Sequence, residues 1–206
     1  MVRLVSNNAI EHFLVEFRDK SSSIQKVNNS VDIISTFLAG EASNFVNAQK
    51  TSVNTPIGLA NGLYITTKIQ IVPVIRAGLA MLSAFCRIFP NALVGPIWLS
   101  RNKDLTVKVH AEKLQSTLTN FTSIIIDPML ATGGTASTVI ELAKKRGATD
   151  IILVNILATP LGIAKITETY DIPIITVKDN ESLDDDFYVY PGVGDSGDRL
   201  FGNIDH

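Results

Sequence analysis

An aspartate, a loop of small residues and a helix pattern follow one another between residues 124 and 147. The apolar run 124–126 ends at Asp127, and the loop after it contains Thr132, Gly133 and Gly134. Unpaired N–H groups at a helix start, with glycines that let a ligand approach the backbone, can bind a phosphate, and a nearby carboxylate suits the hydroxyls of a ribose. The loop lacks the GxxxxGK(S/T) pattern of nucleoside triphosphatases. We therefore predict a site for a phosphorylated sugar; an ordinary strand-to-helix turn with a threonine N-cap is the alternative.

Two arginines stand where strands are expected to end. Arg76 follows the apolar run 69–75, and Arg101 follows a strand pattern that ends at Leu99. Ligands of open α/β sheets bind beyond the carboxyl ends of the strands, so both cations should face the same crevice as Asp127. Two converging guanidinium groups would suit a diphosphate. The alternative for each is a solvated charge at a strand end.

The C-terminal segment contains a formal GxGxxG pattern at Gly192, Gly194 and Gly197. Pro191 precedes it, and only nine residues follow Gly197, too few for the helix and distant acid of a dinucleotide fold. We interpret the segment instead as a glycine-rich loop whose backbone groups could hydrogen-bond a flat heterocycle; a solvated loop is the alternative. Its polar side chains are Asp195, Ser196, Asp198 and Arg199.

These residues need a parallel sheet to bring them together. Short apolar runs that indicate strands buried on both faces lie at 69–75, 93–99, 123–127, 150–158 and 172–177. Helix patterns follow three of them, which is typical of a single α/β domain spanning residues 1–206. Apolar residues with helical spacing at 10–17 and 33–38 predict two N-terminal helices. Alternation between residues 105 and 112 predicts a protruding β-arm.

Composition limits the classes of function. The 206 residues are 46% apolar and 18% charged with a net charge of −2, which favours a globular protein and gives no general attraction to nucleic acid or anionic membrane. No apolar run approaches a membrane span, and no signal peptide is expected. Cys86 is the only cysteine, which fits the reducing cytoplasm. His12, His110 and His206 lack metal-binding spacing, so any Mg²⁺ should arrive with a substrate.

Three segments together resemble the uracil phosphoribosyltransferase family: VPVIRAGLAML (72–82), DPMLATGGTA (127–136) and YVYPGVGDSGDRLFGN (188–203). They occur in the family's order and at its separations. The likeness extends to FRDKSSS (17–23), EA (41–42) and TPIG (55–58). Asp127 and Pro128 stand where most phosphoribosyltransferases of this fold have two acids, and that replacement is itself typical of the uracil branch.

The resemblance implies a type I phosphoribosyltransferase-like parallel sheet flanked by helices. It also implies transfer of the phosphoribosyl group of 5-phosphoribosyl 1-diphosphate (PRPP) to N1 of uracil, giving UMP and diphosphate in pyrimidine salvage. Mg²⁺ would be carried by PRPP rather than held by the protein alone. Such enzymes form homodimers or larger homo-oligomers, to which the arm at 105–114 would contribute, and GTP activates some of them.

The resemblance also implies roles for individual residues. The diphosphate would meet Arg76 and Arg101, which with Asp195 are the candidate catalytic residues. Asp195 would also face PRPP; it is the candidate base for the N1 proton, although orientation alone could fulfil its family role. The ribose and 5′-phosphate would contact Asp127, Pro128, Met129, Leu130, Ala131, Thr132, Gly133, Gly134 and Thr135. Uracil would be surrounded by Val189, Gly194, Asp195 and Ser196.

The chain departs from the family pattern outside these motifs. Gly40 replaces a tyrosine, His110 and Ala111 replace an aromatic pair, and an asparagine and a glycine ahead of the uracil loop are replaced by Asp184 and Phe187. These changes leave oligomer size and GTP activation open. Two other functions are alternatives: a regulator of this fold that senses uridine nucleotides and binds RNA, and a transferase for another base such as orotate or a purine. The near-neutral charge disfavours the first, and the C-terminal loop disfavours the second.

Overall fold

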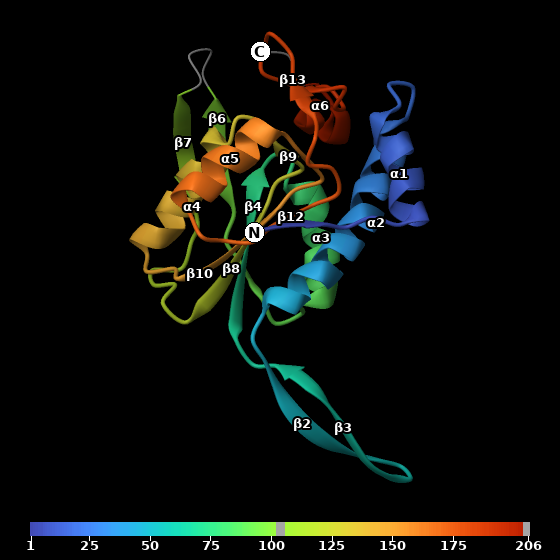
Figure 1. Cartoon of the computed structure of the whole chain (residues 1–206), viewed down its shortest axis with the longest axis vertical. Helices are drawn as coiled ribbons and strands as arrows, with labels where there is room; N and C mark the ends of the chain where they lie inside the picture. Colours follow the sequence, from blue (N-terminus) through green and yellow to red (C-terminus); the bar gives the residue numbers. More distant parts are fainter. Residues whose placement is uncertain (102–105, 204–206) are drawn as a thin grey trace.

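The computed structural model describes residues 1–101 and 106–203, and for Arg101 only the backbone (Figure 1). Within these residues, eight strands form the central sheet, in the order β1-β12-β10-β8-β4-β6-β7 with β5 beside β4. The pairs are parallel except for β6 and β7. The strands are β1 (Val2–Leu4), β4 (Lys68–Ile75), β5 (Leu93–Val94), β6 (Ile97–Arg101), β7 (Val107–Glu112), β8 (Phe121–Ile126), β10 (Asp150–Val154) and β12 (Ile174–Thr176).

Helices cover both faces of this sheet. One side carries α1 (Asn8–Arg18), α2 (Ile24–Ala42) and α3 (Leu79–Ile88), and the other carries α4 (Gly134–Lys145) and α5 (Pro160–Thr169) (Figure 1). Successive side chains of a strand point to opposite faces. Ile124 and Ile126 accordingly pack in the cluster with α1–α3, while Ile125 packs in the cluster with α4 and α5. This two-sided burial confirms the α/β fold class expected from the continuous apolar runs.

Both predicted N-terminal helices are present, and each begins at a side-chain cap. The Asn7 side chain accepts a hydrogen bond from the amide of Ile10 at the start of α1. Ser23 does the same for Lys26 at the start of α2, which is much longer than its short apolar pattern indicated. A short 3₁₀ turn, η1 (Ser43–Phe45), follows α2.

The run 93–99 is less buried than predicted. It divides at Gly95 and Pro96 into β5 and β6, and the side chains of Leu93 and Trp98 are 42% and 52% exposed. The run divides because proline has no N–H to donate to a neighbouring strand. Its side chains are exposed because this part of the sheet lies near the edge.

The predicted β-arm is in the wrong place. Residues 107–112 do form a strand, β7, but it pairs antiparallel with β6 at the edge of the sheet, and Leu105 lies outside the described residues. The segment that projects from the molecule is the hairpin of β2 (Ala48–Thr55) and β3 (Gly58–Ile65) (Figure 1). Alternating polarity identifies a strand but does not reveal which strand it pairs with.

The remaining short elements gather near the carboxyl ends of the central strands. They are β9 (Met129–Leu130), β11 (Leu157–Ala158), β13 (Ser182–Leu183), β14 (Val189–Tyr190) and α6 (Ser196–Phe201). Parallel pairing of β9 with β11 fixes the segment that follows Asp127. Across the described residues, we find no helix with the length and apolar character of a membrane span.

Candidate active site

Two adjoining cavities open at the carboxyl ends of β4 and β8. The smaller, of about 180 Å³, is lined by the loop after β8 and by the C-terminal segment. The larger, of about 850 Å³, adds Arg76 and the β6–β7 edge. Both cavities share Asp127, Thr135, Asp195 and Ser196. The three motifs found in the sequence therefore meet in one cleft.

The predicted phosphate loop has an uncapped helix start. Gly133 is the N-cap residue of α4, with a φ of +78° that favours glycine, and it makes no side-chain capping hydrogen bond. This geometry excludes the alternative of a threonine-capped turn. The N–H groups of the first turn of a helix lack partners within the helix. They are available to an anion in the cavity lined by Thr132, Gly134 and Thr135.

Asp127 lies directly after β8 and is fixed by its own backbone. Its amide donates to the carbonyl of Val154 at 3.2 Å, and its carbonyl accepts from the Asn155 side chain at 2.7 Å. Burial raises the pKa of the Asp127 carboxyl from 3.8 to about 7, and a hydrogen bond from the Met129 amide opposes part of that rise. The carboxyl group is thus held in the cleft at the point where the sequence predicted a ribose.

The predicted arginine pair is only partly described. Arg76 lines the larger cavity, but its guanidinium already donates to the Asp198 carboxylate at 2.5 Å and to the Gly202 carbonyl at 3.4 Å. The backbone of Arg101 ends β6, while its side chain lies outside the described residues. The meeting of the two cations therefore remains a prediction.

The C-terminal segment is more ordered than the predicted loop. Residues 196–201 form α6, and the Asp195 side chain caps it by accepting from the Asp198 amide at 3.0 Å. A six-residue helix is too short to show a periodic apolar pattern. Val189 belongs to β14 and lines the smaller cavity with Gly194, whose φ is +74°.

Several lining residues were not identified from the sequence. Phe187 and Tyr188 border the smaller cavity, and Trp98, Ser100 and His110 border the larger one. Phe187 has a φ of +63°, a left-handed conformation costly for a bulky residue, at the position where the family pattern has glycine. This departure from the family pattern was the one sign in the sequence that could have drawn attention to Phe187.

Lys165 of α5 was also missed. Its Nζ lies 4.0 Å from the position that a Cβ on Gly134 would take, beside the start of α4. A lysine on the exposed face of a predicted helix carries no sign of such a neighbour. The packing of α5 against the phosphate loop brings the two together.

Comparison with known proteins agrees with this geometry. The family model for uracil phosphoribosyltransferase matches residues 4–203. The chain belongs to the uracil phosphoribosyltransferase family. It is 36% identical over 205 residues to a uracil phosphoribosyltransferase of Campylobacter concisus, covering 98% of this chain and 99% of that protein. The corresponding protein of Pediococcus pentosaceus is 38% identical over 196 residues, or 94% of each chain.

Solved structures show the same fold. The AQ2163 protein of Aquifex aeolicus superposes with a TM-score of 0.90 at 30% identity, covering 98% of both chains. A purine phosphoribosyltransferase of Pyrococcus horikoshii has a TM-score of 0.50 at 19% identity over 72% of this chain and 82% of its own, a likeness of fold alone. The fold class and family predicted from the sequence are confirmed. The roles of individual site residues in this member of the uracil phosphoribosyltransferase family stay predictions.

The carboxylates that line the cleft are the side chains available to a divalent cation there. No group of three or more His, Cys, Asp or Glu side chains suited to a metal occurs among residues 1–101 and 106–203. Asp127 and Asp195 are the carboxylates among the described lining residues. Magnesium sites with one or two carboxylates complete their coordination with substrate phosphates and water.

Proposed function

We propose that this protein transfers the phosphoribosyl group of PRPP to N1 of uracil, giving UMP and diphosphate, and that residues 1–206 form one domain for this reaction. The observation that carries the proposal is the meeting of Asp127, the uncapped start of α4 and the Val189–Gly194 segment in one cleft. That arrangement offers partners for a ribose, a phosphate and a flat base side by side. It is the reaction for which the chain's family is named.

Each part of PRPP has a proposed partner. The Asp127 carboxylate accepts hydrogen bonds from the ribose hydroxyls, and residues 132–135 bind the 5′-phosphate at the start of α4. Arg76 and Arg101 bind the diphosphate. Arg76 must then share or exchange its Asp198 contact when the substrate enters.

Catalysis in this arrangement is electrostatic and positional. Loss of diphosphate from the anomeric carbon builds positive charge on the ribose and negative charge on the leaving group, and N1 of uracil attacks in line. Arginine side chains that contact the leaving group stabilise its negative charge. The phosphate loop at 132–135 and the 189–194 segment hold the ribose and uracil in line for the attack. Mg²⁺ bound with PRPP would neutralise further charge on the diphosphate, and Asp127 and Asp195, which line the cleft, are the carboxylates that would hold it. No side-chain nucleophile is needed.

Asp195 serves orientation more than proton transfer. One of its carboxylate oxygens accepts from the Asp198 amide as the cap of α6, which fixes the side chain at the edge of both cavities. Val189, Gly194 and Ser196 complete the proposed uracil site. Backbone groups at Gly194 can hydrogen-bond the base because this residue has no side chain and a Cβ placed there would have no neighbour within 4 Å.

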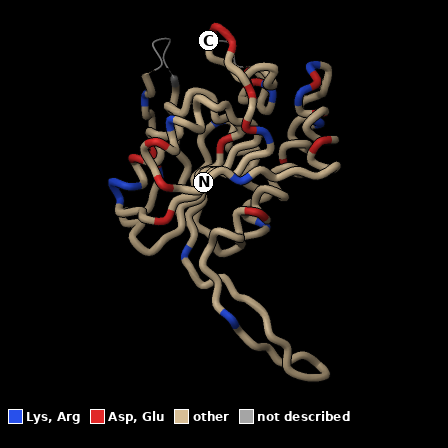
Figure 2. The backbone as a smooth tube through the Cα atoms, in the orientation of Figure 1, with Lys and Arg blue, Asp and Glu red and all other residues tan. Residues whose placement is uncertain are grey.

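The β2–β3 arm supports assembly into a homodimer or larger homo-oligomer. Val53, Ile57 and Leu59 are 57%, 99% and 71% exposed on an isolated two-stranded hairpin, which is marginal in water by itself. Lys50 is the only charged residue between 48 and 65, and Figure 2 shows the arm almost free of charge. A second copy of the chain packed on the arm would remove these apolar side chains from water.

Cytoplasmic location follows from the proposed salvage role, and activation by GTP stays a prediction of family resemblance.

Base choice tests the proposal. Purified protein with PRPP and Mg²⁺ is offered uracil, thymine, cytosine, orotate and hypoxanthine, and UMP or its analogue is measured. Cytosine presents an amino donor and a bare N3 where uracil presents O4 and N3–H, so a buried hydrogen-bonding site should reject it by about 10⁴-fold in kcat/KM. The added methyl of thymine should cost only about 1 to 3 kcal/mol.

Two results would overturn the proposal. A kcat/KM for cytosine within tenfold of that for uracil would show that the C-terminal segment does not select the base. Tight binding of uridine nucleotides without turnover of any base would favour the alternative of a uridine-sensing regulator.

A further inference from the structure

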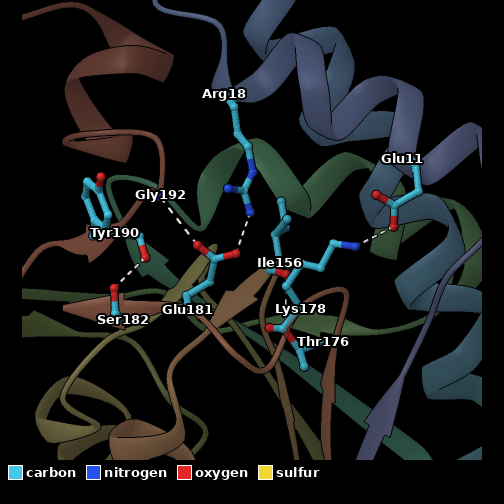
Figure 3. Close-up of polar contacts among 9 residues, drawn as sticks. All are labelled: Glu11, Arg18, Ile156, Thr176, Lys178, Glu181, Ser182, Tyr190 and Gly192. Atoms are coloured by element: carbon cyan, nitrogen blue, oxygen red, sulfur yellow. Dashed lines mark hydrogen bonds and ion pairs between the residues drawn. The ribbon is translucent and has the colours of Figure 1, made fainter.

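A buried carboxylate joins the end of α1 to the segment that lines the proposed uracil site. Glu181, whose side chain is 6% exposed, accepts a hydrogen bond from Arg18 Nη2 at 2.5 Å. Its other oxygen accepts from the Gly192 amide at 3.4 Å (Figure 3). Arg18 is the last residue of α1, and Gly192 lies between Val189 and Gly194. One side chain thus contacts two parts of the chain that are far apart in sequence.

The position of Glu181 is itself fixed by short strands outside the central sheet. Its amide donates to the Ala158 carbonyl at 3.2 Å, which ties it to β11. It directly precedes β13, whose Leu183 pairs with Val189 of β14, and the Ser182 hydroxyl donates to the Tyr190 carbonyl at 3.0 Å (Figure 3). Glu181 is therefore a rigid point from which the following segment can be oriented.

The turn at Gly192 transmits that orientation to the cavity. Gly192 has a φ of +47°, and a Cβ there would lie 1.8 Å from the Val189 carbonyl oxygen, so the backbone from 189 to 192 is tightly folded. Val189 and Gly194, on either side of this turn, line the smaller cavity. A shift of the Gly192 amide must therefore move groups that face the base.

A second arginine ties the same turn of α1 to this segment. Arg199 of α6 donates to the carbonyls of Phe17 and Asp19 at 3.1 and 2.8 Å, and to the Val193 carbonyl at 3.5 Å. The residues around Arg18 are thus held against the C-terminal segment from two directions. The end of α1 is built into the support of the base site.

The buried negative charge of Glu181 makes its ion pair with Arg18 important for the local structure. A carboxylate this deeply buried is stable only with a cation and hydrogen-bond donors around it, so removing Arg18 leaves an uncompensated charge beside the Gly192 amide. Neither Arg18 nor Glu181 is among the described residues that line the two cavities. Any effect of the pair on the reaction must act through the segment it holds.

We propose that Arg18 and Glu181 are positioning residues that hold the 189–194 segment in the conformation that binds uracil. The inference rests on the proposed uracil transfer and adds to it a determinant of base affinity outside the cleft. PRPP should be insensitive to the pair, because the phosphate loop is carried by β8 and α4 instead.

The chain provides a matched control. Glu11 of α1 forms an ion pair at 2.7 Å with Lys178, three residues before Glu181 (Figure 3). This second pair joins the same helix to the same stretch of chain, but the Lys178 backbone bonds to Ile156 and Ala158 rather than to the 189–194 segment. Glu11→Gln therefore removes an ion pair of α1 without touching the support of the base.

The test is steady-state kinetics of the full-length protein, varying uracil at saturating PRPP and then the reverse. Loss of a hydrogen bond to a charged group corresponds to roughly 10- to 100-fold in affinity, so Glu181→Gln and Arg18→Ala should raise the uracil KM by about that factor. The kcat and the PRPP KM should change by no more than about threefold. Arg18→Lys should recover most of the uracil affinity, and the double variant Arg18→Ala with Glu181→Gln should cost little more than either change alone. Glu11→Gln should leave both KM values unchanged.

The outcomes separate this inference from the proposed function. A wild-type protein without uracil transfer would refute the proposed function. An active wild type whose folded Glu181→Gln variant keeps its uracil KM within twofold would overturn the positioning role. A PRPP KM that rises as much as the uracil KM would also overturn it, because general loss of structure would explain both. If Arg18→Ala does not fold, the near-isosteric Glu181→Gln and the conservative Arg18→Lys decide the matter.

Discussion

Replacing Asp127 with asparagine should remove a pH dependence of stability that the wild-type protein carries in its cleft. Burial raises the pKa of this carboxyl to about 7, against an ordinary value of 3.8. Between these values the folded protein keeps a proton that the unfolded chain has released. The free energy of unfolding therefore falls as pH rises from about 4 to about 7 and is constant with respect to this group above that range.

The magnitude follows from the two pKa values. Linkage gives at most about 4 kcal/mol over the full range, and about 2.5 kcal/mol between pH 5 and pH 8, as the destabilisation contributed by Asp127 alone. Glu11, Glu16 and Asp19 have pKa values lowered by hydrogen bonds from Lys178, Lys26 and the Ser21 amide, so they act in the opposite direction and at lower pH. They are present in both proteins and cancel in the comparison.

The assay is urea unfolding of wild type and Asp127→Asn at pH 5 and pH 8. Wild type should lose about 2.5 kcal/mol more than the variant over this interval, with equal m-values in the two proteins. Asp127→Asn should consequently be the more stable protein at pH 8, although we expect it to bind PRPP poorly. Equal pH dependence in the two proteins would refute the assignment of a buried, proton-retaining carboxyl to this position.

Two further substitutions test the phosphate and diphosphate sites. Gly134→Val should fold, since a Cβ there has no neighbour closer than 3.7 Å, but its branched side chain should block the phosphate, so calorimetry should show loss of PRPP binding at unchanged melting temperature. Unchanged PRPP affinity would contradict the proposed cradle. Arg76→Ala should lower kcat by about 10²-fold with a much smaller effect on uracil KM. Asp198→Asn, which breaks the same ion pair but keeps the cation, is its control. Equal losses in both variants would mean that Arg76 acts only by anchoring α6.

Local sequence was sufficient for the strands that deliver the site. The run before Asp127 is continuously apolar because β8 is buried on both faces, and that burial is a property of the segment itself. Parallel strands end at one edge of the sheet, so the prediction that Asp127 and Arg76 face the same crevice needed no further information. The start of α4 was likewise recognisable, because glycine at a left-handed position and a helical apolar pattern are encoded within a few residues.

Contacts between distant segments were decided only by the tertiary structure. Arg76 and Asp198 are 122 positions apart, and Arg18 and Glu181 are 163 apart, so no periodicity or short motif links either pair. The arm was misplaced for a related reason: residues 107–112 alternate in polarity but not in burial, since only Val107 and Glu112 of β7 are half-buried, whereas β2 and β3 are exposed along most of their length and show no alternation. Alternating polarity in the sequence therefore does not tell whether a strand projects from the molecule, because that depends on how the helices and strands pack. The sequence therefore predicts the phosphate loop, Asp127 and Arg76 of the cleft, while the contacts that hold them in place arise only when the chain has folded.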